Sequence, residues 1–236
     1  MTGALVTSFV AATKVLVVAL AALAVGVLGL LLVLRFVDPP GSMLMLTQRL
    51  QGQSIDQQWV PLDAVSPHLV RAVISSEDNN FCTHRGIDLA ELEAAMAKAD
   101  EEGSDVVRGA STITMQVAKN LFLIPARNYL RKGVEMGMAV AIELVWTKRR
   151  TLEMYLNIAE WGPGVFGAEA AARHHFRKAA ARLTAPEAAL MAAALPNPLL
   201  RRPGRPGPGL SRLAGIIETR ARRGGHRFDC IYGPIR

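Results

Sequence analysis

The feature that most constrains this chain is an uninterrupted apolar run near its N-terminus. Residues Val15–Leu34 are twenty consecutive uncharged and almost entirely aliphatic residues. A helix of about twenty such residues crosses the hydrocarbon core of a bilayer. The apolar stretch of a cleaved signal peptide is shorter, usually about 7–15 residues, and the following Asp38-Pro39-Pro40 is a poor cleavage context. We therefore expect an uncleaved transmembrane anchor over residues 15–35.

This anchor divides the chain into unequal parts. Residues 1–14 form a stub too short for a domain, residues 36–62 are expected to be a connector, and residues 63–236 suffice for one domain of ordinary size. Lys14 and the terminal amine favour a cytoplasmic stub, although Arg35 follows the span and opposes that signal. The expected location is the inner membrane, crossed once, with the catalytic domain in the periplasm.

The charge and composition narrow the choice of partner and fold. A net charge of +7 suits an anionic partner such as nucleic acid, an anionic membrane surface or a phosphorylated substrate. Nucleic acid fits poorly with a domain outside the cytoplasm. Half of the residues are hydrophobic but only 6% are aromatic, and abundant alanine favours helices over sheets.

Capping signals predict where the helices begin. Ser66-Pro67 is a typical N-cap and first-turn pair, and Thr184 with Glu187 forms a capping box before a helix that stops at Pro196. No alternating strand pattern stands out, so we expect a mostly α fold. The predicted helices span about 67–78, 88–100, 112–121, 127–146, 148–157, 168–176, 184–195 and 211–223.

Glu77 is the first candidate for chemistry. It lies four residues after Val73 and seven after Val70, so it projects from the apolar stripe near the end of its helix. Partial desolvation there raises the pKa of a carboxyl group toward the range used in proton transfer. Taken alone, this position favours the alternative, a solvated or salt-bridged glutamate at a frayed helix end.

Two further carboxylates interrupt an otherwise apolar helix. Between Gly133 and Trp146 the charged residues are Glu135 and Glu143. A helix that is apolar on every side is expected to be buried, and buried carboxylates are paired or functional. Glu135 is the stronger candidate because Glu143 sits deeper in the helix, and structural pairing with Arg131, Arg127 or another cation is the alternative for both.

The helix predicted at 112–121 carries a polar stripe. Thr112, Gln116 and Lys119 fall on one face at helical spacing. A helix start with free backbone N–H groups beside Ser111, followed by a hydroxyl, an amide and a lysine, suits a phosphate or pyrophosphate. An ordinary amphipathic helix with a polar outer face remains the alternative.

Cys82 and Cys230 could form one disulfide in an oxidising compartment or remain thiols. Several other types of site find no support in the sequence. There is no Cys-x-x-Cys, no zinc-type ligand spacing and no phosphate-binding P-loop. Ser-x-x-Lys and Lys-Thr-Gly are also absent, which excludes a penicillin-binding acyl-transfer domain.

Five runs in order, between residues 60 and 200, together resemble the peptidoglycan glycosyltransferase family. The monofunctional biosynthetic transglycosylases are the closer match, because the acyl-transfer signatures are absent. The runs are Glu77-Asp78-Asn79-Asn80-Phe81 with His84, Gly86 and Asp88; Gly109–Gln116 with Lys119-Asn120; Arg131-Lys132-Gly133-Val134-Glu135; Leu152–Asn157 with Gly162, Gly164, Gly167, Ala171-Ala172 and Phe176; and Glu187, Ala188 and Leu190 with Leu195–Pro198.

The resemblance implies a lysozyme-like helical domain with a small membrane-proximal lobe. It implies polymerisation of lipid II into glycan strands, with Glu77 as the general base and Glu135 organising the donor side or a divalent cation. It makes no cofactor certain and leaves Mg or Mn open. The implied partners are lipid II, the growing strand, the membrane and other cell-wall synthases, but no nucleic acid. The implied substrate-binding residues are Asp78, Ser111, Thr112, Gln116, Lys119, Arg127, Arg131 and Asn157.

The chain departs from the family pattern at three positions. Cys82 stands where an aromatic residue is usual, and Ala110 and Met115 stand where glycine and glutamine are more common. Two other functions compete with polymerisation: a lytic enzyme that uses its main carboxylate as a general acid, and an inactive anchored protein that binds lipid II as a scaffold.

Overall fold

The computed structural model of the chain describes residues 2–103, 109–125 and 129–233. It divides the chain into two compact units, Met1–Pro39 and Pro40–Arg236. The predicted Arg127 lies outside the described residues.

The first unit consists mainly of one long helix, α1 (Thr2–Leu34). Its segment Val10–Leu34 is long and apolar enough to cross a membrane, which matches the predicted apolar run but starts five residues earlier. Side chains along it, such as Val15 and Val25, are about 70% exposed. A helix this apolar and this uncovered is suited to a lipid environment.

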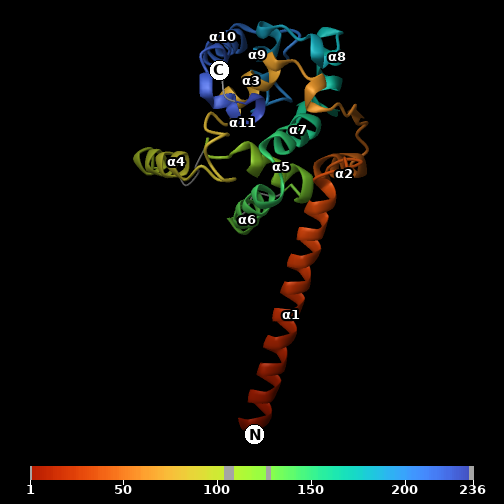
Figure 1. Cartoon of the computed structure of the whole chain (residues 1–236), viewed down its shortest axis with the longest axis vertical. Helices are drawn as coiled ribbons and strands as arrows, with labels where there is room; N and C mark the ends of the chain where they lie inside the picture. Colours follow the sequence, from red (N-terminus) through yellow and green to blue (C-terminus); the bar gives the residue numbers. More distant parts are fainter. Residues whose placement is uncertain (1, 104–108, 126–128, 234–236) are drawn as a thin grey trace. The chain divides into compact units, whose positions relative to one another are not determined.

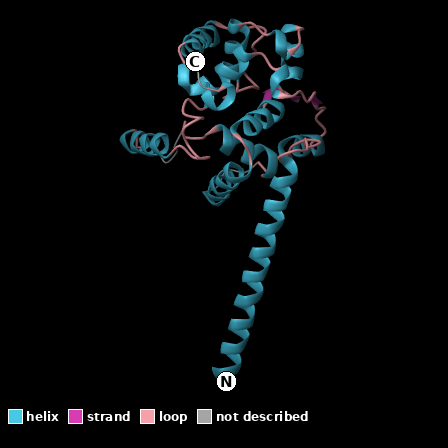
Figure 2. Cartoon of the chain, in the orientation of Figure 1, coloured by secondary structure: helices cyan, strands magenta, loops and turns pink. Residues whose placement is uncertain are grey.

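The second unit is built almost entirely of helices, as predicted (Figures 1 and 2). Short 3₁₀ turns occur at Leu62–Ala64, Ala180–Arg182 and Gly225–Phe228. The α-helices are α2 (Met43–Leu50), α3 (Pro67–Glu77), α4 (Leu89–Glu101), α5 (Ile113–Phe122), α6 (Tyr129–Val145), α7 (Lys148–Ile158), α8 (Ala168–Phe176), α9 (Ala185–Ala194), α10 (Pro208–Arg222) and α11 (Asp229–Tyr232).

Side-chain caps begin the helices where the sequence signals predicted. The Ser66 hydroxyl accepts the His68 N–H at the start of α3, and the Thr112 hydroxyl accepts the Met115 N–H at the start of α5. At α9, the Glu187 carboxylate accepts the N–H of Thr184, which completes the predicted capping box. These contacts satisfy N–H groups that have no partner inside the helix.

A small sheet was not predicted. Its strands β1 (Asp56–Gln57), β2 (Glu160–Gly162) and β3 (Val165–Phe166) lie in the order β1-β3-β2. The β1–β3 pair is parallel and the β2–β3 pair antiparallel. Strands of two or three residues are too short to show an alternating pattern. The sheet joins the segment before α3 to the loop after α7.

The packing of the second unit brings the end of α3 to the start of α5. Helix α3 packs against α9 and α10, and α5 packs against both α6 and α7. Trp161, Tyr155 and Phe81 are the largest fully buried side chains of this core. Gly86 has a φ of +87°, and a Cβ there would lie 2.7 Å from the Ala139 carbonyl oxygen. The loop after α3 therefore rests directly on the backbone of α6.

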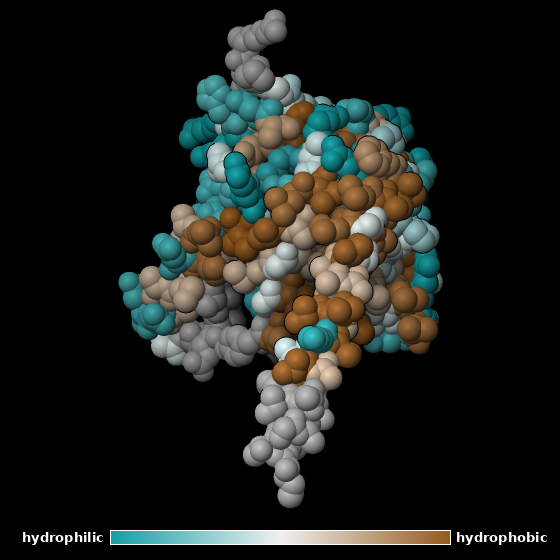
Figure 3. Space-filling model, turned by 60° about the horizontal axis from the view of Figure 1, so that its bottom comes forward, coloured by the Kyte–Doolittle hydropathy of each residue, from teal (hydrophilic) through white to brown (hydrophobic). Residues whose placement is uncertain are grey.

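Helix α6 corrects the prediction of burial on every side. Glu135 is only 2% exposed and Ile142 is fully buried, because this face of α6 packs on α5. The opposite face leaves Leu130 and Leu144 about 80% exposed, so no described part of the protein covers it. Leu46 and Leu50 of α2 are also exposed. Apolar residues are prominent on the face of the molecule presented in Figure 3.

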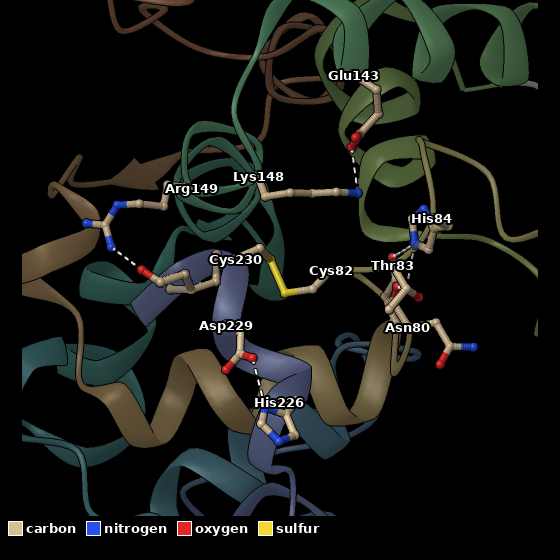
Figure 4. Close-up of a disulfide and its surroundings, with 12 residues drawn as sticks. Asn80, Cys82, Thr83, His84, Glu143, Lys148, Arg149, His226, Asp229 and Cys230 are labelled. Carbon is tan, nitrogen blue, oxygen red and sulfur yellow. Dashed lines mark hydrogen bonds and ion pairs between the residues drawn. A yellow bond between two sulfur atoms is a disulfide. The ribbon is translucent and has the colours of Figure 1, made fainter. Parts of the chain in front are cut away.

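The structure joins Cys82 and Cys230 in a disulfide, with the two Cα atoms 5.4 Å apart (Figure 4). This settles the question that the sequence left open. Cys82 lies in the loop after α3, and Cys230 lies in α11. The bond therefore ties the loop that follows Glu77 and Asp78 to the C-terminal segment.

Candidate active site

Glu77 is the last residue of α3, and side chains from three helices hold its carboxylate. One oxygen accepts a hydrogen bond from the Gln116 amide of α5 at 3.0 Å. The other accepts from the Ser76 hydroxyl at 3.3 Å. The Tyr155 hydroxyl of α7 donates to the Gln116 carbonyl oxygen at 3.2 Å, so it fixes which end of the Gln116 amide faces Glu77. Glu77 is thus a positioned carboxylate and not a frayed helix end.

Burial raises the pKa of the Glu77 carboxyl group above its ordinary value. The hydrogen bonds from Gln116 and Ser76 and the positive charge of Lys119 act in the opposite direction, and the negative charge of Asp78 adds to the rise. A carboxylate whose pKa is raised by desolvation holds a proton more tightly, which makes it a better base once ionised.

Glu77 opens onto a cavity of about 210 Å³. The cavity lies between the end of α3, the start of α4, the segment before α5 and one residue of α10. Its lining is formed by Ser75, Ser76, Glu77, Asp78, Asn79, Asp88, Glu91, Gly109, Ala110, Ser111, Thr112 and Arg220. The structure therefore brings Glu77 together with Asp78, Ser111 and Thr112, as predicted for a common site.

Asp78 and Thr112 are engaged by the protein itself. The Asp78 carboxylate accepts the backbone N–H of Ile113 at 2.9 Å and lies 2.9 Å from the His84 ring. The Thr112 hydroxyl accepts from Met115 and donates to the Gly86 carbonyl oxygen at 2.6 Å. The idea that α5 begins with free N–H groups for a phosphate was wrong in this respect, because a carboxylate and a hydroxyl cap two of them.

Glu135 is the second buried carboxylate of this region. One of its oxygens accepts from Lys132 at 2.9 Å, and the other accepts from Arg131 at 3.2 Å. Lys132 also donates to the Ser111 hydroxyl at 2.9 Å. The predicted pairing with Arg131 is therefore present. Glu135 therefore orients Arg131 and Lys132, and Lys132 connects it to Ser111 at the edge of the cavity.

Lys119 links the two carboxylates electrostatically. Burial lowers the pKa of its ammonium group, and so do the nearby charges of Arg131 and Lys132. The negative charges of Glu135 and Glu77 raise it. Lys119 is half-buried, so the polar stripe of α5 is not a solvated outer face. Lys119, Arg131 and Lys132 form a cluster of three cations near Glu135, and Lys119 also interacts electrostatically with Glu77.

Two residues that the sequence suggested as site candidates make their contacts outside the group formed around Glu77 and Glu135. Asn157 is fully buried, and its side chain is taken up by the backbone of Val60 and Glu153. Glu143 accepts from the Thr114 hydroxyl and pairs with Lys148 at 2.9 Å, which is the structural role that was the alternative for this residue.

Four residues of the site received no role from the sequence. They are Ser76, Lys132, Tyr155 and Arg220. Lys132 and Tyr155 stand inside the recognised runs, so their positions there were an available signal. Arg220 belongs to α10, and its approach to the cavity depends on the packing of α10 against α3, which local spacing does not reveal.

The described residues contain no cluster of three or more His, Cys, Asp or Glu side chains arranged to hold a metal ion. Glu135, the carboxylate that a donor-side cation would use, is already paired with Arg131 and Lys132. The residues present therefore do not fit a divalent-cation site, and no chemical step is derived through one.

The site thus combines a positioned carboxylate with a raised pKa and a group of nearby cations in a helical domain, an arrangement suited to proton transfer at an anionic substrate. Residues 44–217 match the family model described as transglycosylase. The chain belongs to the transglycosylase family, so it is a glycosyltransferase, and the expected lysozyme-like helical architecture is that of this family.

Relatives of similar length support this assignment. The chain is 53% identical to the biosynthetic peptidoglycan transglycosylase of Rhodospirillum centenum, over 91% of this chain and 94% of the relative. It is 50% identical to the protein of the same name from Agrobacterium fabrum, over 81% and 84%. It is 48% identical to that of Rhizobium etli, over 91% and 93%.

Proposed function

We propose that this protein polymerises lipid II into the glycan strands of peptidoglycan and releases undecaprenyl pyrophosphate. The observation that carries the proposal is the position of Glu77. Its pKa is raised by burial, and Lys119 interacts electrostatically with both Glu77 and the paired Glu135. A base on one side and a cation cluster on the other are what the transfer of a sugar from a pyrophosphate requires.

Glu77 acts as the general base in this mechanism. It removes the proton from the 4-hydroxyl of the acceptor sugar, and that oxygen attacks the anomeric carbon of the growing strand from the face opposite the pyrophosphate. The bond between the anomeric carbon and the phosphate oxygen breaks, so the configuration inverts. Gln116 and Ser76 hold the carboxylate in place through the hydrogen bonds described above.

The cation cluster stabilises the leaving group. Charge develops on the pyrophosphate as its bond to the sugar breaks, and Lys119, Arg131 and Lys132 supply compensating positive charge. Glu135 keeps two of these cations oriented. We assign Ser111 and Arg127 to binding the substrate, and we assign Asp78, Thr112, Gln116 and Asn157 to positioning, because their side chains are bonded within the protein.

Purified protein with lipid II in detergent distinguishes this function from its rivals. We expect glycan polymer to accumulate on a gel. Shortening of preformed glycan without synthesis would favour the lytic function, in which Glu77 is a general acid. Binding of lipid II with neither synthesis nor cleavage would favour a scaffold.

The pH dependence of polymerisation tests the environment of Glu77. A general base works in its ionised form, so the rate should rise with pH through a pKa above the ordinary Glu value. Replacing Gln116 by Leu removes a hydrogen bond to the ionised form, so the acidic limb should move to still higher pH. The initial rate measured across pH for both proteins checks this. An unmoved limb would mean that another group titrates.

We also propose that α1 anchors the protein in the inner membrane with the catalytic unit in the periplasm. The support is the apolar span Val10–Leu34 and the disulfide, since disulfides persist in oxidising compartments. The exposed apolar face of α6 is suited to contact the lipid in which the substrate tail lies.

We assign residues 15–35 to the membrane anchor. The second compact unit begins at Pro40, the family match begins at residue 44, and α2 and β1 lie within 40–62, so we assign residues 40–62 to the catalytic unit together with 63–236.

A further inference from the structure

A second and larger cavity lies elsewhere in the catalytic unit. Its volume is about 570 Å³, and it is formed by the C-terminal end of α8, the turn between β2 and β3, and the segment 198–205. It shares no lining residue with the Glu77 cavity. The lining residues are Gly162, Pro163, His174, His175, Arg177, Pro198, Leu199, Arg201, Arg202, Gly204 and Arg205.

The ionisable side chains that line this cavity are all basic. Four arginines and two histidines line it, and no Asp or Glu does. Within the described residues, Arg177, Arg202 and Arg205 form no ion pair. Like charges gathered without counter-charges repel one another, so such a group is favourable where an anionic ligand binds.

Helix ends account for only part of this charge. Cations are favourable at the C-terminus of a helix, which explains Arg177 at the end of α8. Arg201 donates to the Ala193 carbonyl oxygen at 2.7 Å and so caps α9. Arg202 and Arg205 have no such role in the described structure, and they face the same cavity.

The walls of the cavity are held closely together. A Cβ on Gly204 would lie 2.5 Å from the His175 carbonyl oxygen, so the segment 198–205 rests against the end of α8. The His175 ring lies 2.9 Å from the Trp161 carbonyl oxygen. Arg177 has a φ of +57° and is the only residue other than glycine with a positive φ in the described chain. Arg177 is the C-cap of α8, and helices commonly end on a residue in this left-handed conformation.

The size and place of the cavity indicate the kind of anion. A volume of about 570 Å³ is much larger than one phosphate needs and falls within the range of pockets that enclose drug-sized ligands. Pro163, Pro198 and Leu199 add an apolar wall. Helices α8 and α6 lie at opposite ends of this unit in Figure 1, so the cavity is far from the apolar face proposed to meet the lipid. A lipid headgroup is therefore a poor fit.

We propose that this cavity binds the peptides carried by the glycan strand, with Arg177, Arg202 and Arg205 holding the peptide carboxylates. The proposal rests on the proposed polymerase function, because that function places peptide-bearing strands beside the enzyme. Arginine binds carboxylates through paired hydrogen bonds. The cavity would hold the product after it leaves the Glu77 site.

Binding of preformed strands to the full-length protein tests this independently of catalysis. The probes are uncrosslinked strands with their peptides, the same strands stripped of peptides by an amidase, and polyglutamate. The test variant combines Arg177→Gly, Arg202→Ala and Arg205→Ala, since glycine suits the positive φ at position 177. The matched control combines Arg182→Ala, Arg212→Ala and Arg223→Ala, three exposed arginines outside the cavity.

We expect the wild type and the control to bind peptide-bearing strands at least about tenfold more tightly than stripped strands, and the test variant to lose this difference. Equal binding of both kinds of strand by the wild type would overturn the proposal, and so would an unchanged affinity in the test variant. Polyglutamate binding without strand binding would overturn it in favour of an acidic protein partner. If lipid II is not polymerised, the proposed function fails, yet these affinities are still measured.

Discussion

Replacing Glu77 by Gln should lower the initial rate of glycan polymerisation by at least about a hundredfold, because general-base catalysis typically contributes about 10²–10⁴-fold. The amide has nearly the shape of the carboxylate, and its oxygen can still accept the hydrogen bond from Gln116. It cannot take a proton from the acceptor hydroxyl. The rate is measured as polymer formed from lipid II by the purified full-length protein.

The matched control is Glu93→Gln, which makes the same chemical change on an exposed residue of α4 and should retain the wild-type rate. Thermal unfolding in detergent shows whether each variant keeps its fold. A folded Glu77→Gln protein with a rate within tenfold of the wild type would contradict the general-base role. Continued binding of lipid II by that variant would place the loss in the chemical step.

The helices and the position of the site could be predicted because their signals are local. Ser66, Thr112 and Thr184 each cap a helix within one residue of the predicted start. Gln116 was placed on the same stripe as Lys119 by helical spacing alone, and it meets Glu77 in the structure. Such signals involve residues three or four apart, where the geometry of a helix fixes the neighbours.

The remaining features depend on contacts between distant segments. Asp78 caps α5 from 35 residues away, so the sequence around α5 predicted free N–H groups that the structure does not have. The exposed face of α6 was predicted to be buried because apolar residues surround that helix. The rule that a helix apolar on every side is buried inside the protein assumes that the helix would otherwise face water. A membrane surface can cover such a face instead.

The disulfide between Cys82 and Cys230 was beyond prediction for the same reason, and breaking it should have the second largest effect. Its partners are separated by 148 residues. The chain-entropy model gives about 5 kcal/mol for a loop of that length, and measured losses are typically about 2–4 kcal/mol. We expect the double variant Cys82→Ala, Cys230→Ala to melt about 5–15 °C below the wild type, given about 2–4 °C for each kcal/mol. Thermal unfolding of the purified protein in detergent measures this.

Wild-type protein treated with a reductant is the control for that variant, because it loses the disulfide and keeps both cysteine side chains. An equal fall in melting temperature would assign the loss to the bond itself. Arg149 also holds the C-terminal segment, through a hydrogen bond to the Ile231 carbonyl oxygen at 2.7 Å (Figure 4), so the segment keeps this tether when the disulfide is broken. An unchanged melting temperature would mean that this hydrogen bond is enough to hold the segment.

Alkylation of thiols in protein taken from cells should find neither cysteine free, since the proposed periplasmic location is oxidising. Two free thiols would contradict both the disulfide and that location.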